Sequence, residues 1–264
     1  MDLKIIYEMI PPWDWPEDTG KMIQEILADR SVDSSDRLLA AEMAGDVVVF
    51  NDVLAGTLLT ILGNSDETAD LRARAAISFG PALEHADLYE FEDPDDIVLS
   101  EEIYRKIQSS LKKFYYDAGV PKEVRRRILE AAVRAPEDWH SKAIRAAFAS
   151  NDENWRLTAV FCMRFVKGFD QQILEALESE SADIRYEALI AAGNRELKKA
   201  WPLIACLFSD AAIDKTILLA AIDAAAGIDL PEAVNSLIKF LDSNDEDIVD
   251  AANDALFMLQ GGGF

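Results

Sequence analysis

Residues 182–193 read ADIRYEALIAAG, and this stretch decides the fold. An aliphatic residue and Arg185 follow a polar turn, and small or aliphatic residues then recur at the three- and four-residue spacing of an α-helix. The same frame recurs in five more segments: ADLRARAAISFG from Ala69, KEVRRRILEAAV from Lys122, ENWRLTAVFCMR from Glu153, AIDKTILLAAID from Ala212 and, less closely, EDIVDAANDALF from Glu246.

One basic residue marks each unit of this frame. Arg72, Arg125, Arg156, Arg185 and Lys215 occupy the same position, and the steps from Arg125 onward are 31, 29 and 30 residues. A recurrent step near 30 indicates stacked repeats, because each repeat is too small to bury its own apolar face. A structural role is expected for Arg72, Arg125, Arg156 and Arg185, since such side chains can reach an acidic group or the helix-end carbonyls of the adjoining repeat.

Each step has room for two helices. Capping residues and glycines predict helices over 152–166, 171–178 and 182–192, with Asn151 or Asp152 capping the first and Gly193 stopping the last. At the valines 47–49, Asp46 as a cap favours helix over strand. No segment alternates apolar and polar residues as a strand does, so the sequence predicts an all-α fold, an α-solenoid of about fourteen helices.

The turn-D-x-[VI]-R-x-x-A-x-x-A-[AL]-G pattern resembles the HEAT repeat, in the short bacterial form called PBS-lyase HEAT-like. Asp183, Ile184, Arg185, Ala188 and Gly193 carry the resemblance best. It implies one domain over residues 1–264, a superhelical array of helix pairs with weak repeats at 17–65, an acidic insertion at 85–99 and clear repeats at 120–260. The departures at Lys215 and Val249 indicate modified final repeats, as expected of a cap. The repeat specifies architecture and says little about function.

The composition narrows the functional classes. The 264 residues include 26 Lys and Arg against 49 Asp and Glu, a net charge of −23, which repels nucleic acid and anionic lipid. Two His and two Cys leave too few ligands for a zinc site. Cys162 and Cys206 lie alone in apolar sequence, as reduced core thiols of a cytoplasmic protein would. The N-terminus reads neither as a signal peptide nor as a membrane span, so a cytoplasmic location is expected.

Charge is unevenly distributed along the chain. Residues 105–167 hold 14 basic residues against seven acidic ones, whereas the stretch within 85–99 is acidic. The acidic stretch is either a solvated connection or a segment that docks a partner or masks the basic middle. If the basic side chains converge on the concave face, they form a groove for an acidic peptide or a nucleic acid backbone. These candidates are Lys112, Lys113, Lys122, Arg126, Arg134, Lys142 and Arg145.

Two tryptophans precede the first predicted repeat. Trp13 and Trp15 lie in PPWDWPED, a segment stiffened by proline. They form either a plug over the first helix pair or an exposed hook for a partner.

The sequence contains no GxGxxG, P-loop, GxSxG or HExxH motif, and no cofactor or metal site is predicted. We therefore expect a non-catalytic scaffold or adaptor that binds a protein or peptide on its concave face. A regulatory subunit of a larger complex is the second possibility. The resemblance leaves a third possibility, an enzyme or maturation factor like those that act in bilin attachment. A DNA glycosylase, which would hold a flipped base, is a less close alternative. The only cluster that could fit it consists of Trp139, Arg145, Asp152 and Trp155. The oligomeric state stays open.

Overall fold

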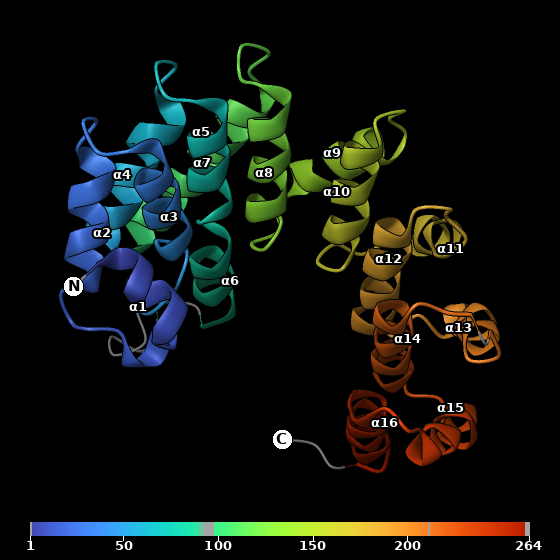
Figure 1. The fold of residues 1–264 in the computed structure, drawn as a ribbon. Helices are drawn as coiled ribbons and strands as arrows, with labels where there is room; N and C mark the ends of the chain where they lie inside the picture. The colour runs from blue at the N-terminus through green and yellow to red at the C-terminus, as the bar shows by residue number, and fades with distance from the viewer. Residues whose placement is uncertain (1, 90, 92–97, 211, 262–264) are drawn as a thin grey trace. The chain divides into compact units, whose positions relative to one another are not determined.

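The computed structural model describes residues 2–89, 91, 98–210 and 212–261. Over these residues the chain forms sixteen α-helices, three short 3-10 helices and no strand (Figure 1). The helices fall into two compact units, residues 1–140 and residues 141–264. We call these unit 1 and unit 2 and describe each by itself.

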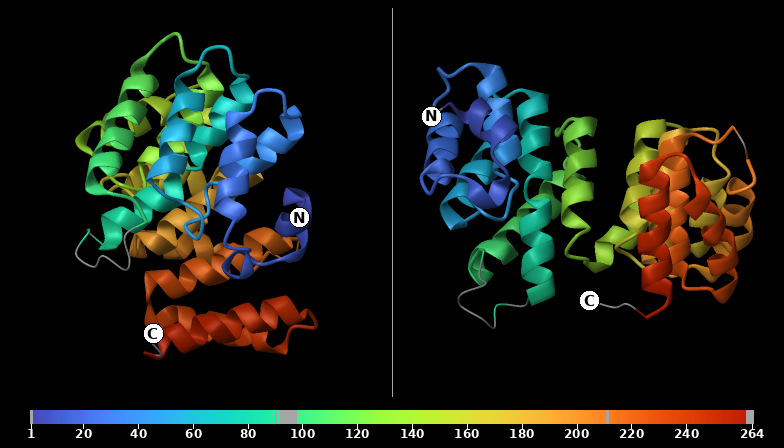
Figure 2. Two further views of the ribbon diagram at one scale, coloured as in Figure 1. Left: turned by 90° about the vertical axis from the view of Figure 1, so that its left-hand side faces the viewer. Right: turned by 60° about the horizontal axis from the view of Figure 1, so that its bottom comes forward.

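Unit 1 is built from two layers of helices (Figures 1 and 2). Helices α3, α5 and α8 pack side by side in the first layer, and α2, α4 and α7 pack side by side in the second layer. Helix α1 packs on α3, and α6 packs on α8. The helices are α1 (Leu3–Met9), α2 (Thr19–Ala28), α3 (Ser34–Met43), α4 (Asp52–Gly63), α5 (Ala69–Ile77), α6 (Gly80–Tyr89), α7 (Glu101–Tyr116) and α8 (Lys122–Ala132), with the 3-10 helix η1 (Pro12–Asp14) after α1.

Unit 2 repeats the two-layer arrangement. Helices α10, α12, α14 and α16 form one layer, and α11, α13 and α15 each pack against it from the same neighbouring layer. Helix α9 (Asp138–Phe148) contains the boundary between the units. The other helices are α10 (Glu153–Met163), α11 (Asp170–Leu177), α12 (Ala182–Asn194), α13 (Trp201–Leu207), α14 (Lys215–Ile228), α15 (Pro231–Leu237) and α16 (Glu246–Leu259), with the 3-10 helices η2 (Lys198–Ala200) and η3 (Ile238–Asp242). The predicted all-α solenoid is confirmed.

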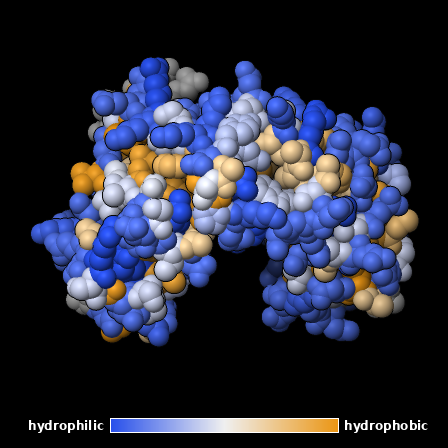
Figure 3. All heavy atoms as spheres, turned by 90° about the horizontal axis from the view of Figure 1, so that it is seen from above, coloured by the Kyte–Doolittle hydropathy of each residue, from blue (hydrophilic) through white to orange (hydrophobic). Residues whose placement is uncertain are grey.

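Repetition of the apolar frame explains why the helices stack. In α4, Leu54, Leu58 and Leu62 recur every four residues and are fully buried between neighbours. Full burial of such a side chain contributes about 1.5–3 kcal/mol. Hydrophilic residues cover most of the visible surface of each unit, with hydrophobic residues in scattered patches (Figure 3). No helix in the described part of the chain combines the length and the apolar character that a membrane span requires.

The close approach of α12 and α14 depends on two glycines. A Cβ on Gly193 would lie 3.1 Å from Ala224 Cα, and a Cβ on Gly227 would lie 2.9 Å from Gly193 O. The prediction that Gly193 stops its helix is wrong, because α12 continues to Asn194. Gly193 serves packing between repeats instead, where any side chain would separate the two backbones.

Two further expectations change in the structure. Residues 46–50 do not begin a helix: the Asp46 carboxylate accepts a hydrogen bond from Val48 N, and α4 starts later with Asn51 as its cap. Of the predicted acidic insertion, residues 85–89 are the second half of α6, and residues 90 and 92–97 lie outside the described residues.

The frame arginines bind the ends of neighbouring helices. Arg72 Nε donates to Leu62 O at 2.9 Å, and Arg185 Nη1 donates to Ser179 O at 2.6 Å. These carbonyls lie at or just beyond the C-terminal ends of α4 and α11, where backbone oxygens lack helical partners. Arg156 instead lies 3.8 Å from a Glu175 carboxylate oxygen.

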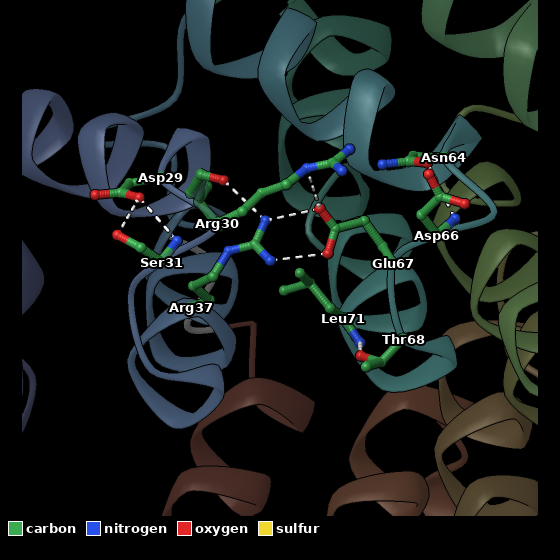
Figure 4. A network of polar contacts seen from close by, with 10 residues as sticks. Asp29, Arg30, Ser31, Arg37, Asn64, Asp66, Glu67, Thr68 and Leu71 are labelled. Carbon is green, nitrogen blue, oxygen red and sulfur yellow. Dashed lines mark hydrogen bonds and ion pairs between the residues drawn. The ribbon is translucent and has the colours of Figure 1, made fainter.

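A basic residue absent from the predicted set has the same role. Arg37 of α3 donates to Leu27 O at 3.0 Å and, through two nitrogens, to the Glu67 carboxylate at 2.8 and 2.9 Å (Figure 4). Arg30 approaches the same carboxylate at 3.6 Å. The pKa of Glu67 is lowered, chiefly by its hydrogen bonds from Arg37. A two-pronged, buried pair of this kind fixes how α3 sits against the α4–α5 turn.

Candidate functional site

A pocket of about 320 Å³ lies on the face of the first layer of unit 1. We call it the first-layer pocket. The C-terminal ends of α3 and α5, the start of α6 and the chain just beyond α8 form its floor and one side, and the N-terminal segment forms the other side. Its lining residues are Tyr7, Pro12, Trp15, Glu42, Met43, Gly45, Asp46, Arg74, Ile77, Ser78, Pro81 and Arg134.

The N-terminal segment reaches the pocket because two prolines end α1 and stiffen the chain. Pro11 and Pro12 cannot continue the helix, and η1 follows directly. The Trp15 indole N–H donates to Ile10 O at 3.0 Å, which closes this turn and places the ring in the pocket wall. Trp13 projects away and is 77% exposed. One tryptophan therefore lines a wall and the other is accessible to a partner.

Glu42 links three elements at the pocket rim. Tyr7 Oη donates to Glu42 Oε1 at 3.1 Å, and Arg74 Nη1 lies 3.5 Å from Glu42 Oε2. The hydrogen bond to Glu42 and the negative charge of that group raise the pKa of Tyr7. Tyr7 therefore stays a neutral donor at physiological pH, and the rim is held by matched charges.

Arg134 closes the far side of the pocket. It forms an ion pair with Glu84 of α6, and its side chain lies against Gly80, where a Cβ would come within 2.9 Å of Arg134 Cδ and Nε. Glycine at position 80 therefore gives this arginine its space. Between the rims, Met43, Ile77 and Pro81 supply apolar surface.

The pocket joins two of the predicted partner-binding residues, Trp15 and Arg134. Sequence reasoning missed Tyr7, Glu42, Arg74 and Ile77, although the repeat register contains a signal for three of them. Arg74 and Ile77 lie two and five positions after Arg72, and Glu42 lies five after Arg37, so all three share one face of equivalent helices.

The remaining basic candidates do not form one cluster in unit 1. Arg126 is buried, with Nη2 3.0 Å from Glu123 and Nη1 3.7 Å from Glu130, so its guanidinium does not face a partner as predicted. Lys112, Lys113 and Lys122 are exposed near the α7–α8 turn, in the second layer and at the start of α8. Lys122 and Arg134 lie at opposite ends of α8, about 18 Å apart along its axis.

The other two basic candidates, Lys142 and Arg145, belong to unit 2. Arg145 lies over the Phe169 ring at 5.0 Å.

Two residues of the cluster matched to a DNA glycosylase, Asp152 and Trp139, have structural roles. Asp152 caps α10 by accepting from Asn154 N at 3.1 Å, and the buried Trp139 donates to Glu137 Oε2 at 2.9 Å. Among the described residues, no group of three or more His, Cys, Asp or Glu is arranged to hold a metal ion.

Comparison with known proteins concerns the fold alone. No protein-family model matches the sequence, and no curated protein sequence matches it. The structure is similar to the X-ray structure of YibA from Escherichia coli, with a TM-score of 0.50 and 16% identity over 96% of this chain and 90% of that one. It is also similar to a mutant of Kap121p, with a TM-score of 0.53 and 15% identity, covering 94% of this chain and 27% of that one.

A weaker likeness, with a TM-score of 0.47 and 16% identity over 96% of this chain and 98% of that one, is to the complex of CpcE and CpcF of phycocyanin lyase from Nostoc sp. PCC7120. At these identities the likenesses concern the fold alone.

Proposed function

We propose that the chain is a non-catalytic interaction protein of the HEAT-like class, which seats an apolar side chain of a protein or peptide partner in the first-layer pocket. The observation that carries the proposal is the pocket itself, an apolar floor between paired charges on the repeat face. Stacked helix pairs offer such a face as a binding surface.

The chemistry of the lining favours a protein segment. Glu42 already accepts from Tyr7 and pairs with Arg74, and Arg134 pairs with Glu84. Apolar contact at the centre with a polar rim is the usual anatomy of a protein interface. Trp13, on the segment that forms the pocket wall, is exposed and belongs to the residue types that most often dominate binding energy.

One pair of variants tests this proposal. Ile77 lines the pocket and is half-buried, whereas Val53 of α4 is 59% exposed and lies outside the pocket. Ile77→Lys places a charge on the apolar floor and should reduce capture of the partner from native lysate by about tenfold, equivalent to about 1.4 kcal/mol. Val53→Lys adds the same charge and should leave capture unchanged.

Circular dichroism should show the same helix content for both variants. Equal capture by both proteins would contradict the pocket as the binding site, and a wild-type chain that retains no stoichiometric partner would contradict the interaction function.

The proposal also includes a cytoplasmic location and the continuation of the repeat through residues 1–264 as one array. The repeat frame on both sides of the unit boundary, from Arg72 to Lys215, supports the second point. Unit 1 and unit 2 are each compact, so the proposed array has two subdivisions.

A further inference from the structure

We propose that the exposed face of α7 binds a short acidic segment of a partner protein. This α7 face consists of Arg105, Lys106, Ser109, Lys112, Lys113 and Tyr116. It lies in the second layer of unit 1 and shares no residue with the first-layer pocket, so it is a second interaction surface.

Helix geometry places these side chains on one stripe. Residues three, four and seven apart share a face, and Arg105, Ser109, Lys112 and Tyr116 follow that spacing. The opposite side is anchored by Ile107 and Leu111, which are fully buried. Because α7 is held through that side, its charged face is presented on a fixed helix. The stripe from Arg105 to Tyr116 is about 17 Å long.

Of the four cations on the α7 face, only Arg105 forms an ion pair with a described residue. Residues 105–116 contain four basic residues and no acidic one, in a chain whose net charge is −23. Arg105 pairs with Glu101 one turn earlier, but Lys106, Lys112 and Lys113 form no ion pair with any described residue. By contrast, Arg126 and Arg127 on α8 pair with Glu123 and Glu130. The lysines of α7 thus keep their charge available for a ligand.

A short acidic segment fits this face better than a nucleic acid. The screening length is about 8 Å at physiological ionic strength. A polyanion longer than the stripe would therefore extend into the field of a strongly acidic chain. A segment of a few carboxylates gains the local attraction without that repulsion, and Tyr116, 54% exposed, adds an apolar contact.

The test measures binding of a fluorescein-labelled pentaglutamate peptide, about as long as the stripe when extended, to the full chain by anisotropy, at about 30 mM and about 150 mM salt. We expect saturable binding at low salt that weakens at the higher salt. Lys106→Glu/Lys112→Glu/Lys113→Glu should weaken it by at least about tenfold, and the matching Lys→Gln triple should weaken it less. The control, Lys198→Glu/Lys199→Glu/Lys239→Glu, reverses three exposed lysines of unit 2 and should leave affinity within about twofold.

Absence of saturable binding, or equal loss in the control, would overturn the proposal. Tighter binding of a ten-nucleotide oligothymidine than of pentaglutamate would assign the face to nucleic acid and overturn the proposal as well. Ile77→Lys should bind pentaglutamate like the wild type, so failure of the pocket and failure of the α7 face are distinguishable.

Discussion

At the scale of single residues, His140 shows how one buried ring can set a pH dependence. Its Nδ1 accepts a hydrogen bond from Glu137 N at 2.8 Å, as the glutamate of a capping box does at the start of a helix. The proton therefore sits on Nε2, which has no hydrogen-bond partner among the described residues. The ring is fully buried. Burial first, and the charge of Lys112 second, lower the pKa of His140 from 6.5 to about 4.

This shift predicts a loss of stability in mild acid. The pKa of His140 is 6.5 in the unfolded chain and about 4 in the folded chain. As pH falls between these two values, the unfolded chain binds the proton before the folded chain does, so the free energy of unfolding decreases. For this group the loss is about 2 kcal/mol at about pH 5. Urea unfolding at about pH 7 and pH 5 should show a smaller loss for His140→Gln, whose amide oxygen keeps the cap but does not titrate. Equal losses in both proteins would contradict a neutral buried His140.

The residue scale also shows what the repeat frame could and could not reveal. Arg72 and Arg185 were found because each follows a polar turn and an aliphatic residue, as the repeat frame requires. Arg37 shares only a later feature of these two repeats, a glycine eight positions beyond the arginine, here Gly45. Arg37 was missed because its segment lacks the aliphatic residue before the arginine. Arg126 was misjudged because three successive arginines look alike in sequence, and only packing shows which of them is buried beside Glu130.

At the scale of helices, the α12–α14 contact offers a matched pair of substitutions. Gly227→Ala would bring a methyl group within 3.0 Å of Gly193 Cα and C, which are backbone atoms that cannot rotate away. The two helices must move apart, and we expect a loss of about 1–3 kcal/mol of unfolding free energy. Gly56 lies inside α4, and a Cβ there would meet nothing within 4 Å.

Gly56→Ala should therefore stabilise the chain by about 0.5–1 kcal/mol, through helix propensity alone. Denaturant unfolding of both variants measures the two effects with the same chemical change. If Gly227→Ala were as stabilising as Gly56→Ala, the glycine contact would not determine the helix spacing.

Helices could be predicted from the sequence where local signals agree, whereas the first-layer pocket could not be predicted. The helix expected at 171–178 is observed as Asp170–Leu177, because capping and spacing act over a few residues. Asp46 and Asn51 are both good caps, and the choice between them depends on how α4 packs against α2, α5 and α7. The first-layer pocket combines Tyr7 with Arg134, more than a hundred residues away. No local pattern contains that proximity.

At the scale of the whole molecule, charge is the dominant long-range property. Unit 2 ends in a strongly acidic stretch, since residues 216–264 contain nine acidic residues and one lysine. Lys215, just before it, bridges Asp245 and Asp247 at 2.7 and 2.6 Å. Because the chain has 49 Asp and Glu but 26 Lys and Arg, 23 acidic residues exceed what one-to-one pairing with cations could neutralise.

That excess predicts how stability responds to salt. A net charge of −23 repels itself more strongly in the folded chain than in the expanded unfolded chain, and salt screens this repulsion. Salt also weakens exposed ion pairs such as Lys4–Glu8, but these contribute about 0–1 kcal/mol each, and the buried Arg37–Glu67 pair is screened least. The melting temperature should therefore rise by about 2–5 °C between about 20 mM and 200 mM sodium chloride at neutral pH. Choline chloride should act equally, since screening depends on ionic strength and not on a bound ion. A melting temperature that falls with salt would mean that ion pairs outweigh the repulsion, and that this acidic chain is stabilised by its charges.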